Sequence, residues 1–322
     1  TQAFIKLVEE EANSRMFGTS LAGIGRAFKQ RLLELAEKEF GPPPVPYSFL
    51  ALGSMAREEQ LLVTDQDNAI ILSDDYNPAE HKEYFTKLAE FVCAGLDACG
   101  YPFCTGGIMA QNPQWMITLS EWKALFHDWI AKPSAKGLLH SSVFFDLESV
   151  WGRSDYAKVL LEQVRAHAKK APGFLACMSR NALLRTPPLG FFKEFVVEKD
   201  GSHYNTINMK RRGSGPLTDI IRVHTLATGG SARNSFARLG ELEKKGILLD
   251  GQGAKLRDAL EIISMIRIRH QARAAAEKRE ADNQVNPEHL GDFERKNLKE
   301  AFQIVSDAQQ FLKFRHQAAG RV

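Results

Sequence analysis

Residues 49–72 read FLALGSMAREEQLLVTDQDNAIIL, a polar segment between two apolar runs. Short apolar runs bounded by turn residues are typical of buried strands, so strands are predicted at 47–53 and 68–73. Gly53 and Ser54 end the first run and predict a tight turn that opens a short helical segment. A glycine lets the backbone approach a ligand closely, and free N–H groups at the start of a helix attract phosphate. The turn is therefore a candidate phosphate-binding element.

Asp65 and Asp67 occupy alternate positions where the chain enters the second strand. Because alternate side chains of a strand point to the same face, the two carboxylates are expected to face one side and to share a divalent ion. Oxygen ligands combined with nucleotide phosphates suit Mg²⁺ (or Mn²⁺), and such sites stabilise the attacking and leaving oxygens of phosphoryl displacement. A Gly-Ser turn or an Asp-x-Asp pair alone is common in ordinary turns and strand entries. Their succession between two strands indicates a nucleotide site.

Helical spacing of apolar residues and helix-stop signals predict the remaining elements. In the first half of the chain we expect a third strand near 103–110 and helices at 2–17, 20–40, 79–99, 120–131 and 134–142. From about residue 153 onward we expect helices at 154–170, 172–185, 216–228, 232–245, 253–279 and 287–316. A hairpin of residues 191–197 and 203–209 is expected to interrupt them at Lys199-Asp200-Gly201, because Asp-Gly is a strong turn signal.

These elements predict an α+β fold with three parts. N-terminal helices at 1–40 pack on the core, a small sheet domain with flanking helices spans 41–150, and a mostly α-helical bundle domain spans 151–322. Trp115 and Trp122 are expected to pack in the core rather than to stack on a base, because aromatic residues dominate cores.

Composition and charge narrow the function classes. The 322 residues are 44% apolar and 25% charged, which is typical of globular proteins and excludes a largely disordered chain. The 42 basic and 39 acidic side chains give a net charge of +3, too small to indicate nucleic acid or an anionic membrane as a partner. No apolar window is long enough to cross a bilayer, and no charged-then-apolar leader opens the sequence.

Four cysteines, Cys93, Cys99, Cys104 and Cys177, show no CxxC spacing. They are interpreted as small buried residues with reduced thiols rather than as a zinc site, since close sequence pairs normally anchor such sites. Reduced thiols favour a cytoplasmic location. The sequence begins with Thr1 rather than Met, and we expect it to be a piece of a longer protein.

The segment GSMAREEQ at 53–60, followed by TDQDNA at 64–69, resembles the nucleotidyltransferase superfamily related to DNA polymerase β, whose signature is a Gly-Ser turn followed by a paired-acid strand. More closely, it resembles a bacterial nucleotidyltransferase family that lies downstream of cyclic-nucleotide-binding and CBS domains in signalling proteins. That family is similar in its core to the uridylyltransferase acting on the nitrogen-regulatory protein PII. The likeness covers roughly residues 5–316, including a C-terminal helical substrate-binding domain, through 100–110, Asn112-Pro113, Trp115, Trp122, 215–222, 267–271 and 286–290.

The resemblance implies roles for four residues of the first motif. Gly53 and Ser54 would hold the nucleoside triphosphate, and Asp65 and Asp67 would bind Mg²⁺. The family's place in signalling proteins also implies sensor domains upstream of the present sequence.

Three basic residues complete the candidate set. Arg57 would contact phosphate or act as a structural partner, and Glu59 could equally be its ion-pair mate. Lys210 precedes a glycine-rich turn and, with Arg222 on the following helix, is a candidate for substrate binding in the helical domain. A basic run such as the one at Lys210 is also typical of a solvated edge.

Two departures from the family pattern concern catalysis. Ala56 stands where relatives commonly have glycine, and the third carboxylate of the superfamily has no counterpart on the strand expected near 103–110. Asp128 and Asp146 are expected on helices. The expected function is Mg²⁺-dependent transfer of a nucleoside monophosphate from an NTP to a hydroxyl acceptor in bacterial signal transduction, and the PII-modifying relative suggests a regulatory protein as acceptor. The missing acid keeps one alternative open, a nucleotide-sensing regulatory module without catalysis.

Overall fold

The computed structural model describes residues 2–10, 12–199 and 201–317 and confirms the α+β class. The chain divides into two compact units. The sheet unit comprises Gly18–Gln60 and Thr64–His167, and the helical unit comprises Thr1–Phe17, Leu61–Val63 and Ala168–Val322. The domain limits drawn from the sequence stay predictions.

A four-stranded mixed sheet forms the centre of the sheet unit, in the order β3-β2-β1-β4. The strands are β1 (Tyr47–Leu52), β2 (Asn68–Leu72), β3 (Met116–Thr118) and β4 (Leu147–Gly152). β1 pairs antiparallel with both β2 and β4, and β2 pairs parallel with β3. Every residue of β1 and β2 is buried, which explains why these two strands could be recognised as apolar runs.

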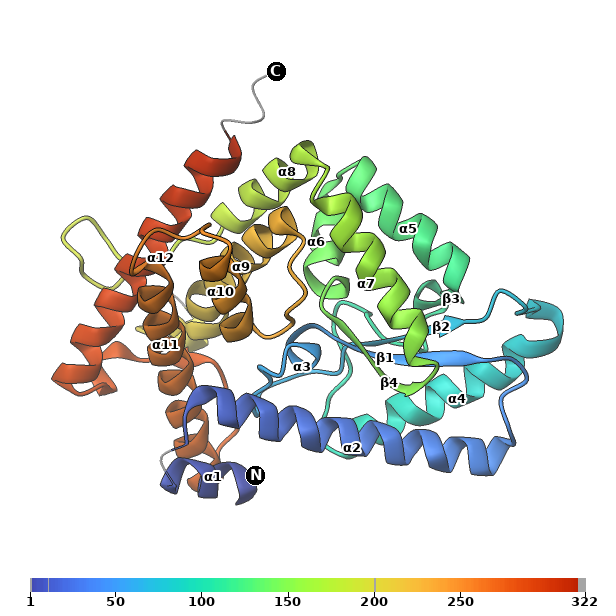
Figure 1. Cartoon of the computed structure of the whole chain (residues 1–322). Coiled ribbons are helices and arrows are strands. Elements are labelled where there is room, and N and C mark those ends of the chain that lie inside the picture. Colours follow the sequence, from blue (N-terminus) through green and yellow to red (C-terminus); the bar gives the residue numbers. More distant parts are fainter. Residues whose placement is uncertain (1, 11, 200, 318–322) are drawn as a thin grey trace. The chain divides into compact units, whose positions relative to one another are not determined.

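Helices flank this sheet. In Figure 1, α2 (Ser14–Phe40) and α4 (Pro78–Ala98) lie below the strands, and α5 (Leu119–Ala131), α6 (Ala135–Phe144) and α7 (Ser154–Ala168) lie above them. Trp122 of α5 donates its indole N–H to the Ile70 carbonyl of β2 at 3.0 Å. Trp115 and Trp122 are both buried and stack with 6.1 Å between their ring centroids, so the prediction of a core role is confirmed.

The helical unit is built from six α-helices, α1 (Gln2–Glu9), α8 (Pro172–Leu183), α9 (Gly215–Thr228), α10 (Ser235–Lys244), α11 (Gln252–Ala276) and α12 (Asp292–Gln317), among the residues that the structure describes. A two-stranded sheet of β5 (Ile207–Asn208) and β6 (Gln284–Val285) joins them. Short helical turns complete the chain at η1 (Pro113–Trp115), η2 (Gly201–His203), η3 (Lys210–Ser214) and η4 (Pro287–His289). Among the described helices, none combines the length and the apolar character that a membrane crossing requires.

The break between the first two helices lies earlier than predicted. α1 ends at Glu9 and α2 begins at Ser14, whereas the sequence placed the break at 18–19. Asn13 accepts a hydrogen bond from the Met16 N–H at 2.9 Å, as a residue before a helix start does. Gly18 lies inside α2, where its missing side chain admits the Glu58 carbonyl rather than ending the helix.

Two sheet predictions were wrong. Residues 103–110 form a loop, and the third strand is β3, which follows η1. β4 was not predicted, because its sequence LESVWG is only partly buried and mixes polar with apolar residues. Asp146 therefore lies between α6 and β4 and not on a helix as expected, whereas Asp128 does lie on α5.

The hairpin predicted from the Asp-Gly signal was also wrong. Residues 191–197 form no strand, and β5 pairs with β6 instead. Asp200 of the predicted turn lies outside the described residues. Phe191 and Phe192, which favoured a strand in the sequence, are 93% and 86% exposed, so burial does not hold them in a sheet.

The two glycines Gly18 and Gly23 of α2 should respond in opposite ways to substitution by alanine. A Cβ on Gly18 would lie 2.1 Å from the Glu58 carbonyl oxygen, whereas one on Gly23 meets nothing within 4 Å. We expect Gly18→Ala to destabilise the fold by about 1–3 kcal/mol through overpacking. Gly23→Ala should raise stability by up to about 1 kcal/mol through helix propensity. Urea unfolding of both variants tests this, and a Gly18→Ala protein as stable as the wild type would contradict the packing.

Candidate metal and nucleotide site

The predicted Gly-Ser turn joins β1 to a single helical turn, α3 (Gly53–Ala56). Gly53 has φ = 60°, in the left-handed region that favours glycine, and its N–H donates to the Asp146 carbonyl at 2.9 Å. A Cβ on Gly53 would lie 3.4 Å from Oδ2 of Asp67. The glycine thus allows both the sharp turn and the close approach of a carboxylate to the backbone.

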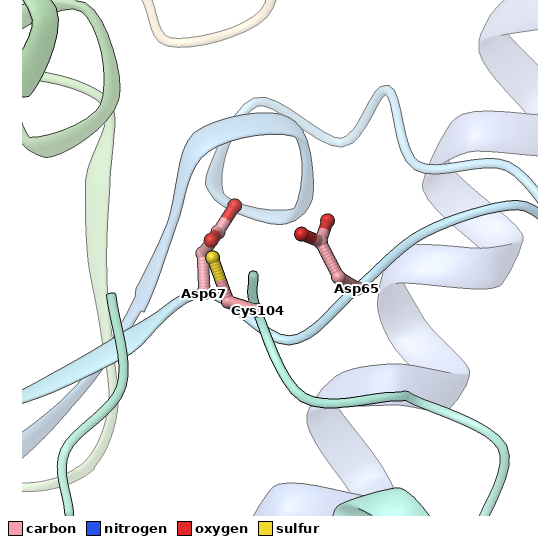
Figure 2. A group of neighbouring side chains, drawn as sticks. All are labelled: Asp65, Asp67 and Cys104. Carbon is pink, nitrogen blue, oxygen red and sulfur yellow. The ribbon is translucent and has the colours of Figure 1, made fainter. Parts of the chain in front are cut away.

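Asp65 and Asp67 lie together, as their alternate spacing predicted. Their carboxylates and the Sγ atom of Cys104 offer ligand atoms that all lie within 4.8 Å of one another. Figure 2 shows the three side chains pointing to the same side of the chain. Both aspartates are half-buried and Cys104 is buried, so the group is shielded but open to a ligand. It is the only such group of three or more His, Cys, Asp or Glu side chains among the described residues.

The intervening residue Gln66 and the following Asn68 explain why the aspartates converge. Gln66 is 1% exposed, and its amide donates to the carbonyls of Cys93 and Tyr101 at 2.9 and 3.0 Å. Asn68 donates to Oε1 of Gln66 at 3.1 Å and accepts from the Ala110 N–H at 2.7 Å. These buried bonds fix the even-numbered side chains inside the unit, so the odd-numbered aspartates point to the opposite side.

Cys104 was not recognised from the sequence as part of this site. The loop reaches the aspartates because the Gln66 N–H donates to the Pro102 carbonyl and Gln66 forms a parallel bridge with Phe103. Burial, followed by the neighbouring Asp67 carboxylate, raises the pKa of the Cys104 thiol to about 12. Cys104 is the one Cys, His, Asp or Glu residue of the segment 103–110. Its presence there was the sequence signal that could have identified it as part of the site. The cysteines are not uniformly buried as expected, since Cys99 is exposed.

Arg57 is held by two carboxylates behind the turn. Its guanidinium lies 2.8 Å from Oε2 of Glu59 and 2.8 Å from Oδ2 of Asp146, so the ion pair with Glu59 is present. Burial alone would lower the pKa of Arg57, but the two carboxylates raise it above its ordinary value. Because the Asp146 side chain is fully buried, this pair connects α3 to the start of β4. The ion pairs are those of a structural partner, and a phosphate contact by Arg57 stays a prediction.

Lys29 of α2 is a charged residue beneath the turn that sequence reasoning missed. It is 2% exposed, and its ammonium group donates to Sδ of Met55 in α3 at 3.0 Å. It also lies 5.7 Å from the ring centroid of Tyr101. Within the described part of the chain, no carboxylate lies at ion-pair distance from it. Burial lowers the pKa of Lys29 to about 8, and the charge of Asp67 offsets part of this effect.

The two candidates of the helical unit differ in their surroundings. Lys210 opens η3 and is exposed. Arg222 is 3% exposed and forms an ion pair with Asp219 one helical turn earlier, at 2.5 Å. Arg222 therefore already has a carboxylate partner, and the structure does not bring it together with Lys210 as one exposed basic surface.

A small mixed sheet that carries two converging acids beside a Gly-Ser turn has the features of the polymerase β-like nucleotidyltransferase class. Two family models match the chain, one described as Putative nucleotidyltransferase DUF294 at residues 1–136 and one described as Putative nucleotidyltransferase substrate binding domain at residues 172–316. The chain belongs to this family of nucleotidyltransferases with a C-terminal substrate-binding domain. No curated protein matches the chain. The link to CBS and cyclic-nucleotide-binding domains stays a prediction.

Replacing Lys29 by methionine should stabilise the protein, because the apolar side chain fills the same space without a buried charge. Lowering the pKa of Lys29 from 10.5 to about 8 means that the folded state disfavours the bound proton. At about 1.4 kcal/mol per unit, this costs about 3 kcal/mol below pH 8. Lys29→Met should therefore gain about 1–3 kcal/mol at pH 7.

The gain should depend on pH. Between about pH 8 and 10.5 the unfolded wild type binds more protons than the folded one, so wild-type stability rises and the gap to Lys29→Met narrows. Urea unfolding from pH 7 to 10 measures both effects. Lys38→Met, at an exposed position of the same helix, is the control and should stay within about 0.5 kcal/mol of the wild type. A Lys29→Met protein less stable than the wild type at pH 7 would refute this account.

Proposed function

We propose that the sheet unit is a Mg²⁺- or Mn²⁺-dependent nucleotidyltransferase that transfers a nucleoside monophosphate from an NTP to a hydroxyl acceptor. The observation that carries the proposal is the convergence of the Asp65 and Asp67 carboxylates beside the Gly53 turn. Membership of the nucleotidyltransferase family supports a nucleotide as one substrate. The proposed setting is cytoplasmic signal transduction, with a regulatory protein of the PII kind as one class of acceptor.

The donor set of the site fits a hard divalent ion. Two carboxylates supply oxygen ligands and leave positions for phosphate oxygens and water, as Mg²⁺ prefers. Cys104 offers a sulfur atom, a soft ligand that suits such an ion less well than carboxylate oxygen does. Asp65 and Asp67 are therefore the proposed ligands. When bound, the ion would neutralise phosphate charge in the transition state of displacement.

The chain's own residues then position the nucleotide rather than act as proton carriers. Gly53 leaves room for a ligand beside Asp67, and the paired Arg57 braces the turn from behind. Such positioning, together with charge stabilisation, supplies most of the rate in phosphoryl transfer. No third carboxylate joins the two aspartates among the described residues, so the acceptor itself would supply the base that activates its hydroxyl.

The missing third acid favours one second candidate, a nucleotide-sensing module without catalysis. The same Asp65, Asp67 and Gly53 would bind the metal-nucleotide complex in both cases. The two candidates therefore differ only in whether bond breaking follows binding, and a transfer assay separates them.

Metal binding should depend on both aspartates. Titration of Mn²⁺ followed by electron paramagnetic resonance should give at least about 10-fold weaker binding for Asp65→Asn and for Asp67→Asn, because each removes an anionic ligand. Asp97→Asn, at an exposed position in the last turn of α4, is the matched control and should bind like the wild type. Cys104→Ser should also retain Mn²⁺ affinity. Unchanged binding in both acid variants would exclude this metal site.

Nucleotidyl transfer should depend on the same acids. The protein is incubated with each NTP and Mg²⁺ or Mn²⁺, with and without cell extract, and mass spectrometry is used to search for an added nucleoside monophosphate mass. We expect Asp67→Asn to reduce transfer at least about 100-fold, the size of effect that one positioned charge has on a transition state. Transfer that persists at the wild-type rate in Asp65→Asn and Asp67→Asn would argue against the proposed site. Metal-dependent nucleotide binding without transfer to any acceptor would support the sensing module.

A further inference from the structure

The helical unit contains a cavity of about 420 Å³ that is separate in its residues from the acid pair. The C-terminal half of α11, β6 and the segment that leads into α12 form its walls. This volume lies within the range of small-molecule sites, which is about 300–1,000 Å³. Ile266, Val285 and Leu290 give it an apolar wall.

Three arginines line the same cavity. Helical spacing on α11 places two of them there, and a turn after this helix places the third. Arg269 and Arg273 lie four residues apart on α11, and residues at this spacing share one face of a helix. Arg279 follows the end of α11, where Lys278 adopts φ = 56° and turns the chain back. The Arg279 N–H then donates to the Ala274 carbonyl at 2.9 Å, which holds this residue beside the last turn of the helix.

Within the described residues, one of these three guanidinium groups has no carboxylate partner. Glu294 lies 2.7 Å from Arg269, and Asp282 lies 2.7 Å from His270. In the described parts of the chain, the side chain of Arg273 forms no ion pair or hydrogen bond. The lining therefore holds more positive than negative charge. A planar guanidinium with free N–H donors can form two parallel hydrogen bonds to a phosphate group.

We propose that this cavity binds a phosphorylated small molecule, with its phosphate on Arg273 and its apolar part against Ile266, Val285 and Leu290. The apolar wall explains why the ligand is more than a free phosphate, since burial of an apolar moiety adds to the affinity in proportion to its area. Arg269 and Arg279 are each paired with a carboxylate, so Arg273 is the arginine of this lining that offers its charge to the phosphate. The site requires no catalysis by the acid pair.

The experiment is calorimetric titration of the full chain with AMP, UMP and inorganic pyrophosphate, in EDTA so that no metal-nucleotide complex forms. Wild type and the Asp65→Asn/Asp67→Asn double variant should bind a nucleoside monophosphate equally, which separates this site from the proposed active site. Arg273→Ala should weaken that binding at least 10-fold, and Arg273→Lys should lose less because it keeps a positive charge. Arg180→Ala, an exposed arginine on α8, is the matched control and should leave affinity unchanged. Thermal unfolding of each variant checks that the fold is retained.

Three results would overturn the proposal. The first is no binding of AMP or UMP at millimolar concentration to the folded wild-type protein. The second is equal affinity in Arg273→Ala and the wild type, or loss of binding in the double aspartate variant, which would place the nucleotide elsewhere. The third is an affinity for pyrophosphate equal to that for either nucleotide. Such a result would show that the apolar wall does not contribute to binding.

Discussion

The geometry of the acid pair depends on the buried hydrogen bonds of two amide side chains, Gln66 and Asn68. Both are almost fully buried, and each satisfies backbone groups of the helix and loop that pack beside β2. Leaving a buried amide unpaired costs about 1–3 kcal/mol, and a one-residue slip of the strand would expose the amides and bury the acids. The register that satisfies the amides is therefore the register that turns Asp65 and Asp67 outward together. The convergence of the two carboxylates follows from interior hydrogen bonding rather than from attraction between the acids themselves, which repel each other.

Two buried cations beside the turn differ in how far their charge is compensated. Arg57 is buried but stands between two carboxylates, so its charge is compensated within the unit. Lys29 contacts the Met55 sulfur and the Tyr101 ring but forms no ion pair within the described residues, and its burial acts against stability. Buried charges without an ion-pair partner are uncommon, because removal from water disfavours the charged form. The charge of Asp67 favours the protonated form of Lys29 and so offsets part of the cost of its burial.

Local patterns in the sequence were sufficient for the centre of the sheet unit and not for its edges. β1, the Gly-Ser turn, β2 and the acid pair were predictable because apolar runs, a glycine and alternate spacing act within a few residues. β4 and Cys104 could not be found this way. β4 becomes a strand only by pairing with β1, about one hundred residues earlier, and Cys104 reaches the acids through a bridge between Gln66 and Phe103. The failed hairpin shows the converse, because a strong local turn signal did not provide a pairing partner for β5, which joins β6 instead.

Between the Gly-Ser turn and the acid pair, the chain passes through the helical unit. The chain leaves the sheet unit after Gln60, contributes Leu61–Val63 to the helical unit and returns at Thr64. Within the helical unit the Val63 N–H donates to Oε1 of Gln271, a fully buried residue of α11, at 3.3 Å. Gln271 lies midway between Arg269 and Arg273, and residues two apart on a helix face different directions. α11 thus carries the cavity arginines on one side and the anchor of the acid loop on another. The hydrogen-bonded Val63 stands two residues before Asp65, so the segment that leads to the acid pair is fixed at its start to the same helix that lines the cavity.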